Sequence, residues 1–157
     1  SIPFGLKEPA LAGEESELIS PVALGWHSLT FLIVDDTPLN LVVLQKRLEH
    51  NGSRVLSACN GEDAIRVYTS NNGVVGIDVI LMDIWMPVLD GLQATKRLRE
   101  MGAMQPIIGL TADYTSAIAT QAMESGMTKV LLKPIKWGQF EQELCPLVAT
   151  QLELHEM

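Results

Sequence analysis

Four short polar segments each lie directly after a run of apolar residues. They are Asp35-Asp36 after residues 31–34, Asp83 after residues 79–82, Thr111-Ala112 after residues 107–110, and Lys133-Pro134 after residues 130–132. If each run is a buried parallel strand, all four segments emerge at one edge of one sheet, where open α/β folds bind their ligands. Carboxylates gathered there would be costly without a counter-charge, because like charges held close together repel. A divalent cation and a phosphoryl group would balance this set.

The elements that must position these residues alternate between short apolar runs and longer amphipathic stretches from Thr30 onward. This order predicts βαβ units around a parallel sheet. Strands are predicted over residues 30–35, 54–58, 77–83, 106–111 and 129–133, and helices over residues 38–51, 61–71, 91–102, 115–126 and 137–152. Thr37 is the expected N-cap of the first helix and Pro38 its first residue. Asp90-Gly91 is expected to make a turn into the third helix, and Pro146 predicts a kink in the last.

The composition fits one folded domain and excludes several function classes. A chain of 157 residues that is 47% hydrophobic can bury a full core. The net charge is −8 and no basic cluster marks one face, so direct nucleic-acid binding is not expected. No apolar run approaches the roughly 20 residues that span a bilayer, and no signal-peptide pattern opens the chain. We therefore expect a cytoplasmic domain without membrane contact.

Residues 1–28 differ in composition from the rest of the chain. They mix prolines and glycines with an acidic stretch at residues 14–17 and show no sustained periodicity, which predicts a linker or arm. Residues 29–152 are the predicted domain and residues 153–157 a short tail. Cys59 and Cys145 fit neither a disulfide framework nor a metal spacing, so reduced packing residues are expected.

The polar segments and their flanks resemble the receiver domain of two-component response regulators. The resemblance covers about residues 29–150 and rests on residues 32–36, 81–91, 110–112 and 132–134, which read LIVDD, LMDIWMPVLDG, LTA and LKP. One such segment alone carries little information, but four in this order, each at a strand end, form a specific pattern. The resemblance implies a flavodoxin-like, doubly wound α/β fold, with a five-stranded parallel sheet of order 2-1-3-4-5 in a three-layer α/β/α arrangement.

The resemblance also implies a phosphorelay in which Asp83 takes a phosphoryl group from a phosphohistidine. The donor would be a histidine kinase or a histidine phosphotransfer protein. The implied ligands of Mg²⁺, or of Mn²⁺ in its place, are Asp36, Asp83, the main-chain carbonyl of Trp85, and Asp35 through a bound water. The implied phosphoryl-binding groups are the Lys133 ammonium, the Thr111 hydroxyl, the Ala112 amide and Trp85. A cis bond between Lys133 and Pro134 is implied as well.

Two positions depart from, or add to, the usual receiver pattern. Val130 stands three residues before the lysine, where receivers usually carry a Tyr or Phe that swings inward on activation. An aliphatic side chain cannot move a ring, which favours a receiver that passes phosphate onward, as in a hybrid histidine kinase, over one that switches an output module. Trp85 flanks the route of water to the phosphorylated aspartate, and we hypothesise that it shields the site; a packing role on the rim is equally compatible with the sequence.

Other functions compete with phosphoacceptance. Each polar segment alone could be a helix cap or a solvated loop residue. A phosphorylation-independent pseudo-receiver that acts as a binding module would need a defective site. An aspartyl-nucleophile phosphatase would need a second aspartate where Trp85 stands. We expect no multiple-turnover enzyme beyond catalysis of the domain's own phosphorylation and dephosphorylation. Leu39, Asn40 and Val43 form a candidate partner contact, and homodimerisation is left open.

Overall fold

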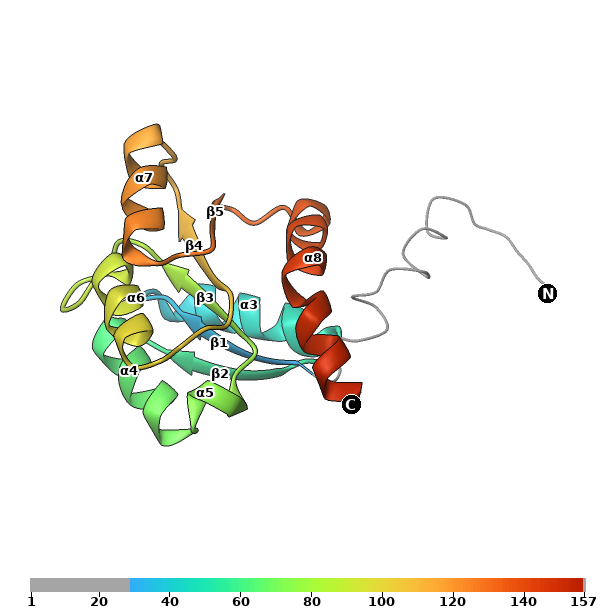
Figure 1. Cartoon of the computed structure of the whole chain (residues 1–157). Coiled ribbons are helices and arrows are strands. Elements are labelled where there is room, and N and C mark those ends of the chain that lie inside the picture. The colour runs from blue at the N-terminus through green and yellow to red at the C-terminus, as the bar shows by residue number, and fades with distance from the viewer. Residues whose placement is uncertain (1–28, 157) are drawn as a thin grey trace, which may run out of the picture.

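The computed structural model describes residues 29–156, with side chains as far as Val148. The elements in chain order are β1 (Thr30–Val34), α3 (Pro38–His50), β2 (Arg54–Ala58), α4 (Gly61–Ser70), α5 (Gly73–Gly76), β3 (Val79–Asp83), α6 (Gly91–Glu100), β4 (Ile107–Thr111), α7 (Ser116–Ser125), β5 (Lys129–Leu132) and α8 (Trp137–Glu156). The strands form one parallel sheet in the order β2-β1-β3-β4-β5, as predicted (Figure 1). None of the helices in this part of the chain is long and apolar enough to cross a bilayer.

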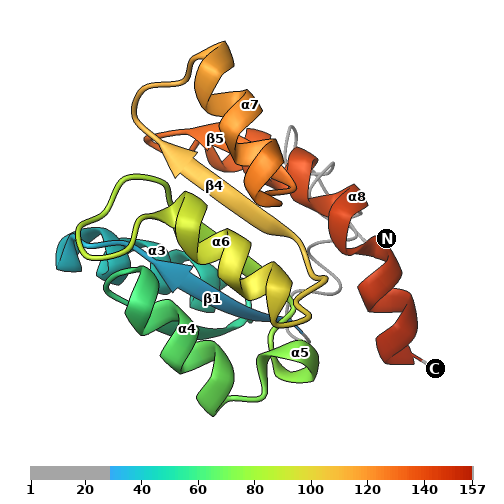
Figure 2. The same ribbon diagram turned by 60° about the vertical axis from the view of Figure 1, so that its left-hand side comes forward.

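The helices cover both faces of the sheet, which gives the predicted three layers. Figures 1 and 2 show α4 and α6 together on one face, with α3 on the other. Because successive strand residues point to opposite faces, Leu32 and Met82 pack in the core under α4, α6 and α7, whereas Phe31 and Leu81 pack in the core under α3 and α8. The central strands β1, β3 and β4 are therefore largely buried and apolar on both sides, as is typical of buried parallel strands.

Side chains cap most of the helices at the carboxyl-terminal edge of the sheet. Asn60, Asp90 and Thr115 accept backbone N–H bonds at the starts of α4, α6 and α7, at 2.8, 2.8 and 3.1 Å. The turn role predicted for Asp90 is thus confirmed. Thr37 occupies the N-cap position of α3, but its side chain makes no capping bond. The carboxylate of Asp35 accepts the Thr37 N–H instead, at 2.9 Å.

Several predicted boundaries were wrong. The third strand begins at Val79 and not at residue 77, because residues 73–76 form the short helix α5, which the sequence pattern did not indicate. The side-chain amide of Gln105 donates to the carbonyls of Gly73 and Ile77, at 2.9 and 2.8 Å, and so holds α5 from a distant loop. α8 runs to Glu156, beyond the predicted end at residue 152. Cys59 is exposed and not a packing residue. The predicted arm, residues 1–28, lies outside the described residues.

Val88 has a backbone conformation that is unfavourable for a β-branched residue. Its φ is 73°, and the Leu89 N–H donates to the Pro87 carbonyl at 2.9 Å across a three-residue turn. The Val88 side chain is 76% exposed, so little packing offsets this strain. The turn leads from the Asp83 loop into α6.

We expect Val88→Asn to raise the free energy of unfolding by about 1 kcal/mol, because Asn tolerates the left-handed region and Val does not. Urea unfolding followed by circular dichroism would measure the change. Val75→Asn is the matched control, since Val75 is equally exposed at 76% but lies in helix α5. An equal effect of the two substitutions would show that surface polarity, and not backbone strain, is responsible.

Candidate functional site

Three carboxylates meet at the carboxyl-terminal edge of the sheet. Asp35 and Asp36 directly follow β1, and Asp83 is the last residue of β3. One carboxylate oxygen of each lies within 4.8 Å of the other two. Asp35 and Asp83 are buried, at 4% and 7% exposure, whereas Asp36 is exposed. The structure therefore brings together the acidic cluster that the strand-end pattern predicted.

Lys133 reaches this cluster from the edge strand β5. Its Nζ lies 3.4 Å from the Oδ2 atom of Asp35 and 3.4 Å from the Oδ2 atom of Asp83. The Lys133 N–H also donates to the Thr111 carbonyl at 2.7 Å, which fixes the start of the loop. The bond between Lys133 and Pro134 is cis, as the resemblance implied. A single ammonium group thus bridges two buried carboxylates.

Thr111 lies beside Asp83 on the neighbouring strand. Asp83 pairs with Leu110 in the register of β3 and β4, and Thr111 is the next residue. The Thr111 side chain is buried, and its hydroxyl both accepts the Asp113 N–H at 3.2 Å and donates to the Asp113 carbonyl at 3.4 Å. Ala112 follows and is exposed. Its small side chain leaves the edge of the sheet open next to the hydroxyl.

The loop after Asp83 exposes Trp85 and contacts the Asp83 backbone at Gly91. Trp85 is half exposed, at 50%, so its indole lies at the surface of the domain. The Gly91 N–H donates to the Ile84 carbonyl at 2.7 Å. A Cβ atom at Gly91 would collide with the Asp83 carbonyl oxygen, so α6 begins in direct contact with the Asp83 backbone. The sequence predicted a turn at Gly91 but did not indicate that this glycine supports Asp83.

Asn40 has a role that the sequence did not predict. Its side-chain amide donates to the Asp35 Oδ2 atom at 3.3 Å, so Asn40 orients a carboxylate of the acidic cluster. Its neighbours Leu39 and Val43 are exposed, at 69% and 58%. A polar residue three positions into a helix that follows an aspartate pair is the signal that could have indicated this contact.

The electrostatics of the cluster disfavour a charged Asp83. Burial raises the pKa of Asp83 above its ordinary value, and the Asp35 and Asp36 carboxylates raise it further, while the Lys133 ammonium lowers it in part. Three carboxylates face one ammonium, so the site carries excess negative charge. Oxygen ligands of this kind suit a hard divalent cation such as Mg²⁺, and the donor set fits that ion.

We expect Asp83→Asn to stabilise the domain at neutral pH in a buffer that contains a chelator, by on the order of 1 kcal/mol. Because the pKa of Asp83 is raised in the folded state, wild-type stability falls as pH rises from below the ordinary aspartate range through the raised value. The variant lacks this loss of stability, so the free energies of unfolding of the two proteins should become similar at acidic pH. Urea unfolding at several pH values measures the difference, with Asp113→Asn as an exposed control. A wild type that is more stable at every pH would contradict the prediction.

Comparisons with known proteins agree with this geometry. Residues 31–144 match the response regulator receiver domain family. Sensor histidine kinase RcsC of Escherichia coli (strain K12) is 35% identical over 116 residues, which are 74% of this chain and 12% of the kinase. Two-component response regulator 24 of Arabidopsis thaliana is 40% identical over 112 residues, which are 71% of this chain and 78% of that protein.

A solved structure shows the same fold. The receiver domain of sensor histidine kinase PA1611 from Pseudomonas aeruginosa PAO1, which has a magnesium ion coordinated in its active site cleft, aligns with a TM-score of 0.68 and 32% identity, and the alignment covers 77% of this chain and 98% of that one. The family match extends over the sheet, the acidic cluster and Lys133. The chain therefore belongs to the response regulator receiver domain family of two-component systems.

Proposed function

We propose that this receiver domain accepts a phosphoryl group on Asp83 from a phosphohistidine of a histidine kinase or a histidine phosphotransfer protein. The observation that carries the proposal is the convergence of Asp35, Asp36 and Asp83 with the Lys133 ammonium, 3.4 Å from two of these carboxylates. A stable ion pair needs only one carboxylate and one ammonium. The additional buried carboxylate is a cost to stability that a phosphoryl-transfer site would explain.

The transfer follows from the chemistry of these side chains. An Asp83 oxygen attacks phosphorus, the phosphorus–nitrogen bond to the donor imidazole breaks, and the histidine leaves while Asp83 becomes an aspartyl phosphate. The Lys133 ammonium is placed to offset negative charge on the phosphoryl oxygens. Thr111 ends β4 and Ala112 follows it at the same edge of the sheet. The Thr111 hydroxyl and the Ala112 amide would donate hydrogen bonds to those oxygens as charge spreads over them.

Asp35, Asp36 and Asp83 would hold Mg²⁺ or Mn²⁺, with the Trp85 carbonyl as a neutral ligand. A divalent cation at this cluster supplies the charge neutralisation that lets an anionic phosphoryl group approach a carboxylate. The magnesium ion in the PA1611 receiver supports this assignment. Asn40 and the Thr37 N–H hold the Asp35 carboxylate in the cluster through hydrogen bonds.

Incubation with Mg²⁺ and phosphoramidate, followed by intact-mass measurement, tests the proposal. We expect the wild type to gain one phosphoryl group and Asp83→Asn to gain none. Asp113→Asn, which changes an exposed carboxylate beside Thr111, should gain it as the wild type does. No gain by the wild type would leave a pseudo-receiver binding module as the better description, and release of phosphate over many turnovers from added esters would favour a phosphatase.

We predict that Trp85→Ala shortens the lifetime of the phosphorylated domain several-fold, because the half-exposed indole limits the access of water to the aspartyl phosphate. The decay of the phosphorylated mass after removal of the donor measures this. Trp137→Phe is the control, since Trp137 packs against Phe140 in α8 and lies outside the acidic cluster. An unchanged half-life in Trp85→Ala would assign the indole to rim packing.

The remaining assignments concern the protein around the site. We propose that residues 29–152 are the receiver unit, that residues 1–28 are a linker or arm, and that the domain works in the cytoplasm. The exposed Leu39 and Val43 on α3, next to Asp35, support a docking site for the phosphohistidine donor. Homodimerisation stays a prediction from the sequence.

A further inference from the structure

Three exposed apolar residues lie at the amino-terminal edge of the sheet, opposite to the phosphoryl site. They are Val74 and Val75 of α5, at 56% and 76% exposure, and Met104 of the loop before β4, at 91%. Met104 directly precedes Gln105, whose side-chain amide donates to carbonyls at both ends of α5, at 2.9 and 2.8 Å. Figure 2 shows α5 at the end of the sheet where the strands begin. We call these three residues the amino-edge patch.

The backbone under the amino-edge patch is held in place by buried contacts. A Cβ atom at Gly73 would collide with the Tyr68 ring, so α5 begins in direct contact with that ring. The Tyr68 hydroxyl donates to the Gln105 side-chain oxygen at 3.2 Å, and both side chains are buried. Exposed apolar side chains on a fixed support favour a surface that another segment covers, because little further ordering is needed when that segment binds.

The segment that precedes β1 joins the domain close to this patch. The Thr30 N–H donates to the Asp78 carboxylate at 2.8 Å, and Asp78 comes two residues after the end of α5. Three residues of chain lead from Val75 to Asp78, so the two lie at most about 11 Å apart. The seven residues 22–28 span about 23 Å when extended, which is enough to reach the patch from the start of β1.

The sequence directly before the domain is apolar and uncharged. Residues 18–28 read LISPVALGWHS and contain no Asp, Glu, Lys or Arg, although 19% of the whole chain is charged. Six of these eleven residues are Leu, Ile, Val, Ala or Trp. Solvated linkers are usually polar, whereas apolar side chains lower the free energy when they leave water. The amino-edge patch offers an apolar surface within reach of this segment.

We infer that residues 22–28 dock on the amino-edge patch, with the Trp26 indole against Met104. Trp26 is the largest apolar side chain of the segment and lies three residues before Leu29, the first residue that the structure describes. A methionine thioether is a favourable partner for an aromatic ring. The inference does not depend on phosphoryl transfer, because the patch and Asp83 lie at opposite edges of the sheet.

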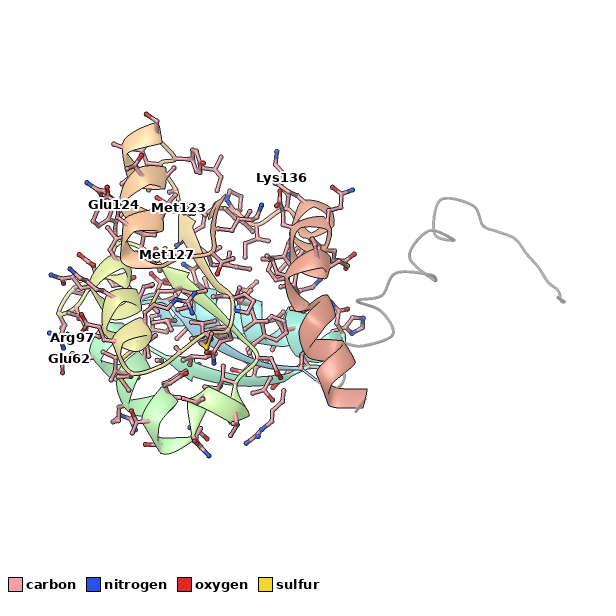
Figure 3. All side chains as sticks on the ribbon, viewed as in Figure 1. Glu62, Arg97, Met123, Glu124, Met127 and Lys136 are labelled. Atoms are coloured by element: carbon pink, nitrogen blue, oxygen red, sulfur yellow. The ribbon has the colours of Figure 1, made fainter. Side chains whose placement is uncertain are left out.

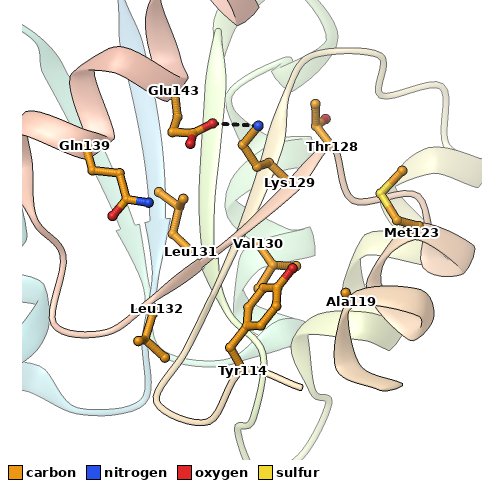
Figure 4. Close-up of a pocket in the computed structure, with 10 residues that line it drawn as sticks. All are labelled: Tyr114, Ala119, Met123, Thr128, Lys129, Val130, Leu131, Leu132, Gln139 and Glu143. Carbon is orange, nitrogen blue, oxygen red and sulfur yellow. Dashed lines mark ion pairs between the residues drawn. The ribbon is translucent and has the colours of Figure 1, made fainter. Parts of the chain in front are cut away.

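Methyl NMR of the full chain, labelled with ¹³C at the methionine methyl groups, tests this contact. Met104→Leu assigns the Met104 resonance. We expect a nuclear Overhauser cross-peak between the Met104 methyl and indole protons, which Trp26→Ala removes and the matched variant Trp85→Ala leaves in place. Trp26→Ala should also shift the Met104 resonance. The Met123 methyl is the control, since Met123 is 62% exposed but lies on α7, away from α5, where it lines a groove between α7 and α8 (Figures 3 and 4).

Each contrary result has a distinct meaning. A Met104 methyl without an indole cross-peak, or with an unchanged resonance in Trp26→Ala, overturns the docking of residues 22–28. A cross-peak that disappears on dilution also overturns it, because a second copy of the chain would then cover the patch. Equal shifts of Met104 and Met123 in Trp26→Ala would show a general effect on the domain and no contact. Mass gain with phosphoramidate, which tests the proposed function separately, should be unchanged in Trp26→Ala.

Discussion

Lys133→Met is expected to slow phosphorylation of Asp83 by about 10²–10³-fold, the typical cost of one preorganised charge-stabilising group. The Lys133 ammonium lies 3.4 Å from the carboxylates of Asp35 and Asp83. The Lys133 side chain provides the positive charge at the acidic cluster. Its removal leaves the incoming phosphoryl oxygens facing carboxylates only. The initial rate of mass gain with phosphoramidate and saturating Mg²⁺ measures the loss.

Lys129→Met is the matched control. Lys129 lies on the same strand, and its ammonium pairs with Glu143 at 2.5 Å in the groove between α7 and α8 (Figure 4). This variant loses the same charge but keeps the acidic cluster intact, so its rate should remain within a few-fold of the wild type. Equal slowing in both variants would show that net charge, and not the position of Lys133, governs the reaction.

Gly91→Ala is expected to lower the free energy of unfolding by about 3 kcal/mol, at the upper end of the usual cost of overpacking. The added Cβ would collide with the Asp83 carbonyl oxygen and with the Ile84 Cα atom, which are backbone atoms and cannot rotate away. Either α6 moves outward and loses the bond from the Gly91 N–H to the Ile84 carbonyl, or the Asp83 backbone moves. In both cases the acidic cluster is distorted, so stabilisation by Mg²⁺ should decrease as well. Urea unfolding with and without Mg²⁺ measures both effects.

Gly138→Ala serves as the control for this prediction. A Cβ at Gly138 in α8 meets no atom within 4 Å, so this variant should be as stable as the wild type or more stable, because Ala favours the helix. If Gly91→Ala kept full stability and a full response to Mg²⁺, the contact between α6 and Asp83 would not constrain the site.

The gathering of the site at one edge of the sheet could be predicted because it follows from local patterns, whereas the order of the strands was implied by the resemblance to receiver domains. A run such as residues 79–82 is apolar on both faces, which only a buried strand satisfies, and Asp83 at its end then has to lie at the carboxyl-terminal edge. Contacts that depend on two distant segments could not be predicted in this way. Nothing local to Gly91 indicates that the Asp83 backbone lies against it, and nothing near residue 73 indicates that Gln105 holds α5.

The backbone conformation at Val88 could not be predicted from the sequence either. Val is a poor residue for a positive φ, so the sequence pattern at Val88 argues against the turn that the structure has there. The sequence pattern also did not predict that Asp35 has two roles at once. The sequence allowed either a helix cap or a member of the acidic cluster, whereas the carboxylate accepts the Thr37 N–H and contacts Lys133 at the same time.

The position of each strand within the sheet makes the acidic residues and Lys133 differ in their resistance to local unfolding. Asp35 and Asp36 follow β1 and Asp83 ends β3, and both of these strands have neighbours on both sides. Lys133 follows β5, which is an edge strand with a partly exposed residue pattern. Edge elements open with lower free energy than central strands, so amide exchange should be faster along β5 than along β3. Mild denaturant would therefore displace the Lys133 ammonium while the three carboxylates remain assembled. A partly opened domain of this kind would still hold a divalent ion but would be a poor phosphoryl acceptor.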